Sequence, residues 1–494
     1  MKLIIMYSLK VSFFIPFLLF YNLLIAQNYQ AINGSSYAGS LGTGNNPASI
    51  VSTPFAWDIT PLAVQIKQST NAFFIKNYSF FSSPKNADVS IQNGSKKRFF
   101  FSNQNIHLLN TRINLNSNAA IAFGANIRNY VYILNSKSDW QDTVLELADF
   151  MKNNINNLPL SGESVGSTWA EFYGTYAQKI FDDGYRTLNA GVTIKLNRAL
   201  AGAYVNTSEV NYTQLAGVNN DRYSLTSGSL QYGYSSNLDL IDNNKSFADN
   251  RKAFLQNANY TVTADVGFEY LLLSSEDEEA ASDDIYDTKI GVSILDLGSN
   301  KYQYGSRSRQ VAGTGKDISN SVLENKFTPL RTLDNFNDSL ATISNSITIP
   351  SGDFYIYEPT RLVLNVDKHV SQSLFVNAEL TVPVISLSSQ NTLFIKDMNL
   401  LALTPRWETK SLGGYFPVLV NAKGQIWIGG AFKAGPVLMG VHNLSNLFSK
   451  NKSQNGGVYL AFTIRPGEKY DRAGHYPKNK LTRKERRSLS CPVL

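Results

Sequence analysis

The sequence predicts an all-β protein, a transmembrane antiparallel β-barrel of about 14 strands with an N-terminal hatch segment and a few short loop helices. Apolar and polar residues alternate along many runs of about 10 residues, the length that a tilted strand needs to cross a bilayer. Aromatic residues make up 12% of the chain and charged residues only 17%, whereas a soluble domain carries about 25% charged residues. After the first 26 residues, no uncharged apolar run reaches the ~18 residues of a membrane helix.

Residues 1–26 are typical of a cleaved secretory signal. Lys2 and Lys10 accompany an apolar run from Val11 to Ile25, and a small residue precedes Gln27. The run is shorter than the ~20 residues that span a bilayer, so a membrane anchor is the weaker alternative. The single cysteine, Cys491, excludes an intramolecular disulfide. We therefore expect export to the outer membrane of a Gram-negative bacterium.

Residues 27–58 precede the first segment with strand alternation, ITPLAVQIKQS at 59–69, and we expect them to form a hatch or plug in the lumen. Glycines in this segment permit close packing, and an asparagine before a proline favours a turn. An ordinary flexible N-terminal turn remains the alternative. The candidate residues for a hatch or a ligand pocket are Gly44, Asn46, Pro47, Ala48, Phe55 and Trp57.

Residues 59–466 are expected to form the barrel wall. Segments 118–133, 186–197 and 259–270 place apolar residues on one face and polar or small residues on the other. Length favours about 14 strands, with 12 to 18 as the range and an even number expected. A water-soluble β-sandwich has a similar pattern. Aromatic residues near strand ends are expected in the interfacial girdles of a membrane barrel; they are Tyr130, Tyr132, Tyr260 and Tyr270.

The polar face of these strands is expected to point into the lumen. Its charged members either line a permeation path or pair into salt bridges that close it, and pairing is slightly favoured because buried charges need partners or water. The candidate residues are Arg128, Lys195, Asp265, Glu269 and Glu379.

Four segments interrupt or follow the strands. Residues 138–157 have helical spacing, with Ser138 or Asp139 available as a cap, and residues 329–346 are a second candidate helix. The acidic run at 274–287 is expected to be a solvated loop. Residues 467–494, which contain KNKLTRKERR, are expected to be a basic periplasmic tail.

Catalytic and metal-binding patterns are sparse. His369 shares a predicted strand face with Asp367 and Ser371, but strand neighbours on one face lie about 7 Å apart and cannot form a hydrogen-bonded triad. No nucleophile elbow, HExxH helix, P-loop or paired-cysteine site is present in a convincing context. We therefore expect a protein that is not an enzyme and needs no cofactor or metal.

Two segments resemble known barrels. GNNPASI, residues 44–50, resembles the Asn-Pro-Ala element of FadL-type fatty-acid channels and of the related PorV-like barrels of Bacteroidota, where it belongs to an N-terminal hatch. Residues 403–448 and the GGVYLAFTI strand resemble a family of Bacteroidota outer-membrane barrels without an assigned function. This chain departs from such barrels because it continues past Ile464 instead of ending on an aromatic residue, although Phe462 is available for assembly.

The resemblance implies two functions. FadL-like architecture implies transport of hydrophobic small molecules across the outer membrane, whereas PorV-like architecture implies a scaffold or shuttle for protein secretion or envelope assembly. A soluble secreted adhesin is the third alternative. The expected partners are outer-membrane lipid, a lipophilic ligand and secretion or envelope proteins; the net charge of +7 in an exported chain does not indicate nucleic acid.

Overall fold

The computed structural model describes most of the chain. The described residues are 30–144, 146–216, 222–242, 244–273, 286–315, 318–328, 332–371, 373–384 and 393–466. The predicted signal peptide, most of the acidic run, the basic tail and Cys491 lie outside these residues.

The wall is a closed ring of 14 antiparallel strands, which confirms the predicted fold class and strand number. β1 (Trp57–Thr70) pairs on one side with β4 (Gly94–Asn114) and on the other with β25 (Val458–Ile464), so the first and last wall strands close the ring. The remaining wall strands follow in chain order: β5 (Ala119–Trp140), β6 (Leu160–Asp182), β7 (Arg186–Gln214), β9 (Tyr260–Leu273), β10 (Tyr286–Leu297), β15 (Arg361–Ser371), β16 (Leu374–Pro383), β18 (Leu400–Glu408), β19 (Leu412–Tyr415) with β20 (Val418–Asn421), β21 (Ile426–Ile428) with β22 (Gly430–Ala434), and β23 (Val437–Val441). The alternative prediction of a water-soluble β-sandwich with two sheets is therefore wrong.

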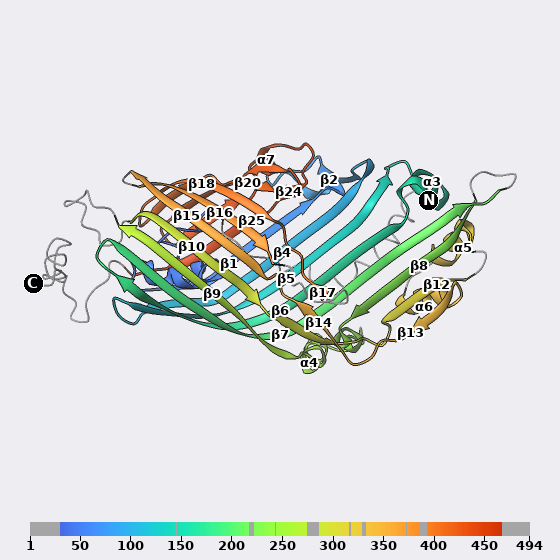
Figure 1. Cartoon of the computed structure of the whole chain (residues 1–494), viewed down its shortest axis with the longest axis horizontal. Coiled ribbons are helices and arrows are strands. Elements are labelled where there is room, and N and C mark those ends of the chain that lie inside the picture. The colour runs from blue at the N-terminus through green and yellow to red at the C-terminus, as the bar shows by residue number, and fades with distance from the viewer. Residues whose placement is uncertain are drawn as a thin grey trace, which may run out of the picture.

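The two ends of the barrel differ. At the end where β1 begins and β25 ends, neighbouring strands are joined by short turns such as 183–185 and 435–436. Long connections with helices join the strands at the other end, on the right of Figure 1. Membrane barrels have short periplasmic turns and longer extracellular loops, so we assign the short-turn end to the periplasm.

Alternation turns apolar side chains outward along the wall. In β7, Val192, Ile194 and Leu196 are 40–54% exposed, while the residues between them are buried. The same pattern of exposed apolar residues recurs around the ring, for example Phe268 in β9, Val292 in β10, Leu403 in β18 and Leu460 in β25. Such a surface is stable only against lipid.

Tyr130 and Tyr132 do not belong to an interfacial girdle, contrary to the prediction. Both are at most 3% exposed and pack inside the barrel beside Trp169. The reason is register, because they share a strand face with the inward-pointing Arg128. Tyr260, by contrast, is 58% exposed on the outer face.

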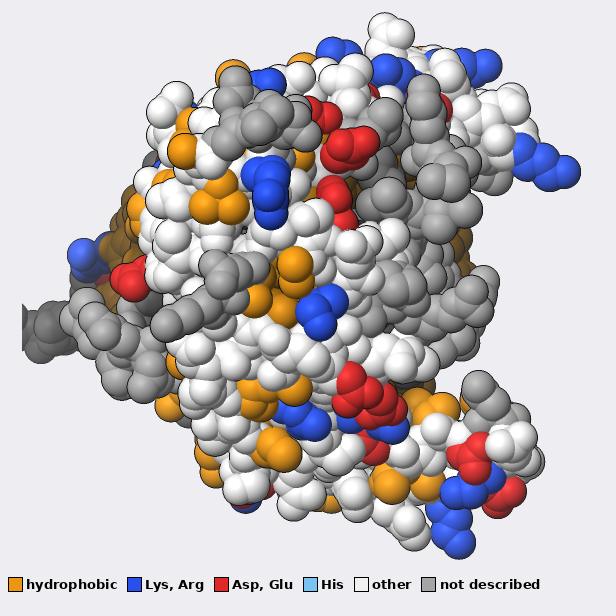
Figure 2. Space-filling model, turned by 90° about the vertical axis from the view of Figure 1, so that its right-hand side faces the viewer, with side chains coloured by type: hydrophobic (Ala, Val, Ile, Leu, Met, Phe, Trp, Pro, Cys, Tyr) orange, Lys and Arg blue, Asp and Glu red, His pale blue; other side chains and the backbone are white. Residues whose placement is uncertain are grey.

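One side of the wall continues beyond the membrane as an extracellular extension. The first part of β7 pairs with β9, and its last part pairs with β8 (Tyr223–Tyr234). β12 (Arg309–Thr314) and β13 (Ser344–Thr348) continue this sheet, and α3 (Leu147–Asn154), α5 (Asn320–Phe327) and α6 (Leu333–Ala341) lie at the same end (Figure 1). Figure 2 looks onto this end, where charged side chains of both signs are scattered among uncharged ones.

The helix predicted at 329–346 is present as α6, but the helix predicted at 138–157 begins only at Leu147. Residues 138–140 instead continue β5 and pair with residues 94–96 of β4, so neither Ser138 nor Asp139 caps a helix. Strand pairing satisfies the same backbone groups that a helix would. None of the helices among the described residues is long and apolar enough to cross a membrane.

A small sheet lies against the inner face of the extension. This inner sheet consists of β11 (Ser299–Gln303), β14 (Asp353–Tyr357) and β17 (Leu393–Phe394). Its Tyr302, Phe354 and Ile356 are buried in one cluster with aromatic residues of β4, β5 and β6. The extracellular half of the barrel interior is therefore filled by an aromatic core.

Candidate functional site: the plugged lumen

The plug segment, residues 30–56, lies inside the periplasmic half of the barrel (Figure 1, blue coils at left). It forms two short 3-10 helices, η1 (Gly39–Gly44) and η2 (Pro47–Ser52). Asn46 begins η2, because its side-chain Oδ1 accepts a hydrogen bond from the Ala48 backbone N at 3.0 Å and a proline follows it. The Asn-Pro-Ala element is thus a helix start.

Three wall glycines make room for this helix start. A Cβ atom on Gly191 of β7 would lie 2.5 Å from the Pro47 carbonyl carbon, and one on Gly267 of β9 would lie 2.1 Å from Asn46 Oδ1. A Cβ on Gly291 of β10 would lie 3.0 Å from Asn46 Nδ2, which donates to the Phe268 carbonyl at 2.8 Å. These glycines form a cradle into which any larger side chain would intrude.

Buried carboxylates of the wall hold the plug at several points. Glu379 accepts hydrogen bonds from Gln30, Asn33 and Asn45 at 3.0–3.2 Å. Three further plug contacts involve Ser52 Oγ with Glu269 at 2.5 Å, Ser35 Oγ with Glu408 at 2.7 Å and the Ser40 N–H with Asp58 at 2.7 Å. In each of these contacts a neutral group of the plug donates and a carboxylate of the wall accepts. Hydrogen bonds to charged acceptors therefore hold the plug in the lumen.

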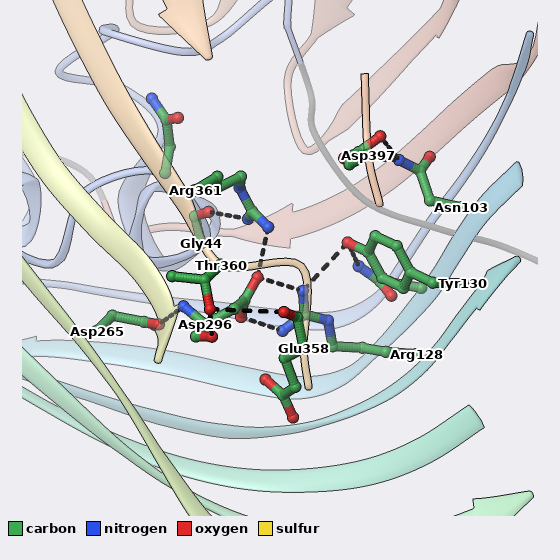
Figure 3. Close-up of polar contacts among 12 residues, drawn as sticks. Gly44, Asn103, Arg128, Tyr130, Asp265, Asp296, Glu358, Thr360, Arg361 and Asp397 are labelled. Atoms are coloured by element: carbon green, nitrogen blue, oxygen red, sulfur yellow. Dashed lines mark hydrogen bonds and ion pairs between the residues drawn. The ribbon is translucent and has the colours of Figure 1, made fainter. Parts of the chain in front are cut away.

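A charged cluster lies between the plug and the inner sheet (Figure 3). Asp296 of β10 accepts two hydrogen bonds from Arg128 at 2.5 and 2.8 Å, one from Lys195 at 2.6 Å and one from Arg361. Lys195 also contacts Asp265 at 2.7 Å, and Arg128 contacts Glu171 at 3.1 Å. Each of these side chains is at most 7% exposed, and together they join β5, β6, β7, β9, β10 and β15.

A β-bulge brings Asp296 into the cluster. The register of β10 against β9 shifts between Ile294 and Leu297, and Asp296 has a left-handed backbone with φ of 60°. Leu295 and Asp296 are consequently both buried, whereas strict alternation would turn Asp296 outward beside Ile294. After Asp296 the chain leaves the wall to become β11, and it returns through Glu358 and Arg361.

Glu358, in the connection from β14 to β15, is a fully buried carboxyl beside this cluster, and no cation of the described residues is bonded to it. It is 1% exposed, its Oε1 accepts from Asn197 and Asn300, and its Oε2 has no hydrogen-bond partner within the described part of the chain. Burial and the nearby Asp296 carboxylate raise the pKa of Glu358 to about 8. With Glu358 neutral, the charges of the cluster balance. Its three cations, Arg128, Lys195 and Arg361, face three anions, which are Asp296, Asp265 and Glu171.

We expect this raised pKa to make folding depend on pH. The folded-state value exceeds the ordinary 4.5, so the stability that the neutral carboxyl contributes is complete below pH 4.5 and is lost as the pH rises to about 8. Glu358→Gln should remove this part of the decline, a few kcal/mol at most. Urea unfolding in detergent at a series of pH values measures it. Glu209→Gln, at an exposed position of β7, should keep the wild-type profile, and an unchanged profile in Glu358→Gln would refute the assignment.

A second constriction lies on the extracellular side. Residues 393–398, from the connection between β16 and β18, fold into the barrel, where Ile395 and Met398 join the aromatic core. Lys396 pairs with Glu163 of β6, and Asp397 accepts from Asn103 of β4 at 3.3 Å (Figure 3). The interior is thus closed by the plug below and by this segment and the inner sheet above.

The structure places most of the predicted site residues inside the lumen. All five predicted lumen charges, listed above, are buried at 5% exposure or less, and Gly44, Asn46, Pro47, Ala48 and Phe55 lie in the plug. Trp57 differs, because it starts β1 on the outer face and is 38% exposed, so it lines no pocket in the lumen. A depression of about 540 Å³ lies instead between η5 (Ser236–Leu240) and α4 (Phe247–Gln256), on the extracellular side.

Sequence reasoning missed several residues that carry the site. Asp58, Glu171 and Glu408 lie at inward strand positions, so the alternation itself would have found them. Arg361 also lies at an inward strand position, the first of β15. Asp296 lies at the bulge and Glu358 beside the inner sheet, where the strand period gives no signal. Among the described residues, no three His, Cys, Asp or Glu side chains are grouped to hold a metal ion.

Fold and site together define a transmembrane β-barrel whose lumen is filled by its own N-terminal segment and an inner sheet. Residues 47–441 match the family of unknown function DUF5723, so the chain belongs to this family. No functionally curated protein matches the sequence.

The solved structures that the chain matches include a monoaromatic hydrocarbon channel, a FadL homologue and a siderophore receptor. The TodX deltaS2S3 mutant monoaromatic hydrocarbon channel is 9% identical, with 85% of this chain and 92% of that chain covered and a TM-score of 0.35. A FadL homologue of Pseudomonas aeruginosa is 8% identical, with 89% and 98% covered and a TM-score of 0.39. The siderophore receptor PirA of Pseudomonas aeruginosa is 10% identical, with 83% and 81% covered and a TM-score of 0.19.

Proposed function

We propose that this chain is a FadL-like channel that carries hydrophobic small molecules across the outer membrane of a Gram-negative bacterium, without catalysis. In this proposal residues 27–58 are the hatch, residues 59–466 are the wall and residues 467–494 are a periplasmic tail. The observation that carries it is the plug itself. It is a segment separate from the wall, seated by hydrogen bonds and a glycine cradle, so it can leave the lumen without breaking a wall strand.

The side chains above the plug are evidence for an apolar substrate. The aromatic core around Tyr132, Trp169 and Phe354 offers the kind of surface that apolar ligands bind. The charged cluster around Asp296 closes the path below this core in the plugged state. Movement of the plug, which contacts Arg361 through the Gly44 carbonyl at 3.4 Å, is the step that we propose opens the path.

A reversible cross-link tests the hatch. Ser40 Oγ of the plug and Thr60 Oγ1 of β1 lie 3.0 Å apart, so Ser40→Cys with Thr60→Cys, in a Cys491→Ser background, places two thiols within reach of a disulfide. The loop closed by this bond contains η2 and all of η1 except Gly39. Uptake of radiolabelled oleate and toluene is measured in cells that lack their own channels for them.

We expect uptake to be lost in the oxidised double variant and restored by dithiothreitol, with each single cysteine variant active throughout. Equal uptake before and after oxidation, with the cross-link verified on gels, would exclude the plug as the hatch. Absence of uptake of both probes in the uncross-linked protein would count against hydrophobic transport.

The extracellular extension favours a second candidate, a scaffold for exported or envelope proteins. β8, β12 and β13 with α5 and α6 project beyond the membrane-spanning wall and have a small core of their own around Val311 and Leu340. Affinity purification of the full chain from its native membrane tests this candidate. Stoichiometric retention of an exported protein would support it, and recovery of the barrel alone would not.

A further inference from the structure

Two extracellular connections join into one surface on the outer side of the wall, which we call the lipid patch. β2 (Phe73–Lys76) and β3 (Asp88–Ile91) form a hairpin after β1, and α7 (Ser445–Phe448) follows β23. Ile75 exchanges two backbone hydrogen bonds of 3.0 Å with Ser453, and the Phe80 N–H donates to the Asn446 carbonyl at 3.0 Å. These bonds fix the two connections against each other.

The lipid patch lies outside the barrel. In β22, Lys433 is buried in the interior and Phe432 is 49% exposed outside, so Gly430 shares the outer face. A Cβ atom on Gly430 would meet the Leu444 side chain at 2.7 Å. The segment that enters α7 therefore covers the outer face of the wall, which agrees with the position of α7 at the upper outline of Figure 1.

The patch exposes aromatic rings beside the apolar belt. Phe81 and Phe448 are each 77% exposed, and their ring centroids lie 6.1 Å apart. The neighbouring wall strands still carry outward apolar residues at this level, such as Ile428, which is 50% exposed. Aromatic side chains at this border of a membrane barrel are stabilised by the headgroup region of the bilayer.

The same surface is rich in cations. Residues 71–93 and 442–457 contain four lysines, Lys76, Lys85, Lys450 and Lys452, and a single acidic residue, Asp88. Within the described part of the chain, no ion pair engages these four lysines. Lys76 and Lys452 both lie over the Phe74 ring, with Nζ 5.0 and 4.8 Å from its centroid, so their charges are held together.

We propose that the lipid patch binds a phosphate-bearing lipid of the outer leaflet. The phenylalanine rings enter the boundary between headgroups and acyl chains, and the lysines contact the phosphate. Lipid is the occupant that fits, because the patch continues the lipid-facing belt, lies outside the wall and carries positive charge. This inference is independent of what the channel carries.

Native mass spectrometry of the purified full chain tests the proposal. It measures the binding of short-chain phosphatidylglycerol and of short-chain phosphatidylcholine. Lys450→Gln with Lys452→Gln should weaken phosphatidylglycerol binding about thirtyfold, the effect expected for two lysines near an anionic surface. Lys97→Gln with Lys137→Gln, at exposed facing positions near the extracellular ends of β4 and β5, is the matched control and should retain wild-type binding. Phe81→Ser with Phe448→Ser should weaken binding of both lipids.

Equal affinity of the lysine variant and its control for phosphatidylglycerol would overturn the proposal. Competition by inorganic phosphate as strong as by phosphatidylglycerol would also overturn it, because the site would then be a free-anion site. An unheated gel, on which a folded barrel migrates differently from the heated chain, verifies that each variant is folded.

Discussion

Asp296→Asn is expected to destabilise the barrel by about 3–5 kcal/mol, the cost of leaving buried charges without their partner. One carboxylate forms ion pairs with Arg128, Lys195 and Arg361 in a site with at most 7% exposure. Asparagine keeps the shape and tolerates the left-handed backbone at this position, so the loss of charge is isolated. The free energy of unfolding in urea, followed by the shift between folded and unfolded bands on unheated gels, measures the effect.

Asp287→Asn is the matched control for this prediction. Asp287 lies in the same strand and pairs with Lys368 at 2.7 Å, but both side chains are about half exposed. An exposed pair of this kind contributes about 0–1 kcal/mol. Similar losses in the two variants would contradict the view that the cluster around Asp296 organises the interior.

Gly267→Val is expected to displace the plug. Its Cβ would lie 2.1 Å from Asn46 Oδ1 and 2.9 Å from the Pro47 ring, at the start of η2, where the plug has little freedom to shift. Overpacking of this kind costs about 1–3 kcal/mol, which changes the ratio of displaced to seated plug roughly fivefold to 150-fold. Limited proteolysis of the N-terminal segment in the folded barrel reports the displaced fraction.

Gly174→Val serves as the control, because Gly174 lies on the outer face of β6 and a Cβ there would meet nothing within 4 Å. Cleavage should remain at the wild-type rate in this variant. If Gly267→Val is cleaved no faster than Gly174→Val, the glycine cradle does not seat the plug.

Strand periodicity was sufficient to predict the wall. Val192, Lys195 and Asn197 fall on the faces that the alternation assigns to them, because the period of a strand is close to two wherever one side faces lipid. The inward position of Glu269 and Glu379 follows from the same rule. The plug as an interior segment was expected from its glycines and from its place ahead of the first strand.

The inner sheet and the bulge could not be predicted in this way. Residues 353–357 alternate like a wall strand, yet they form β14 inside the barrel, because the partner that buries them comes from distant parts of the chain. Asp296 turns inward only through its left-handed backbone, which the alternation does not reveal. The direction in which a side chain points at a bulge depends on contacts with distant parts of the chain. The sequence pattern therefore did not identify Asp296, the centre of the charged cluster.

Single-channel conductance in planar bilayers tests the central claim, that the N-terminal segment closes the lumen from within. The intact chain is compared with a variant that lacks residues 30–52, after gel mobility has verified that both are folded. We expect the intact chain to be closed for most of the recording and the truncated chain to show long-lived open states. Equal conductance in the two would contradict the account.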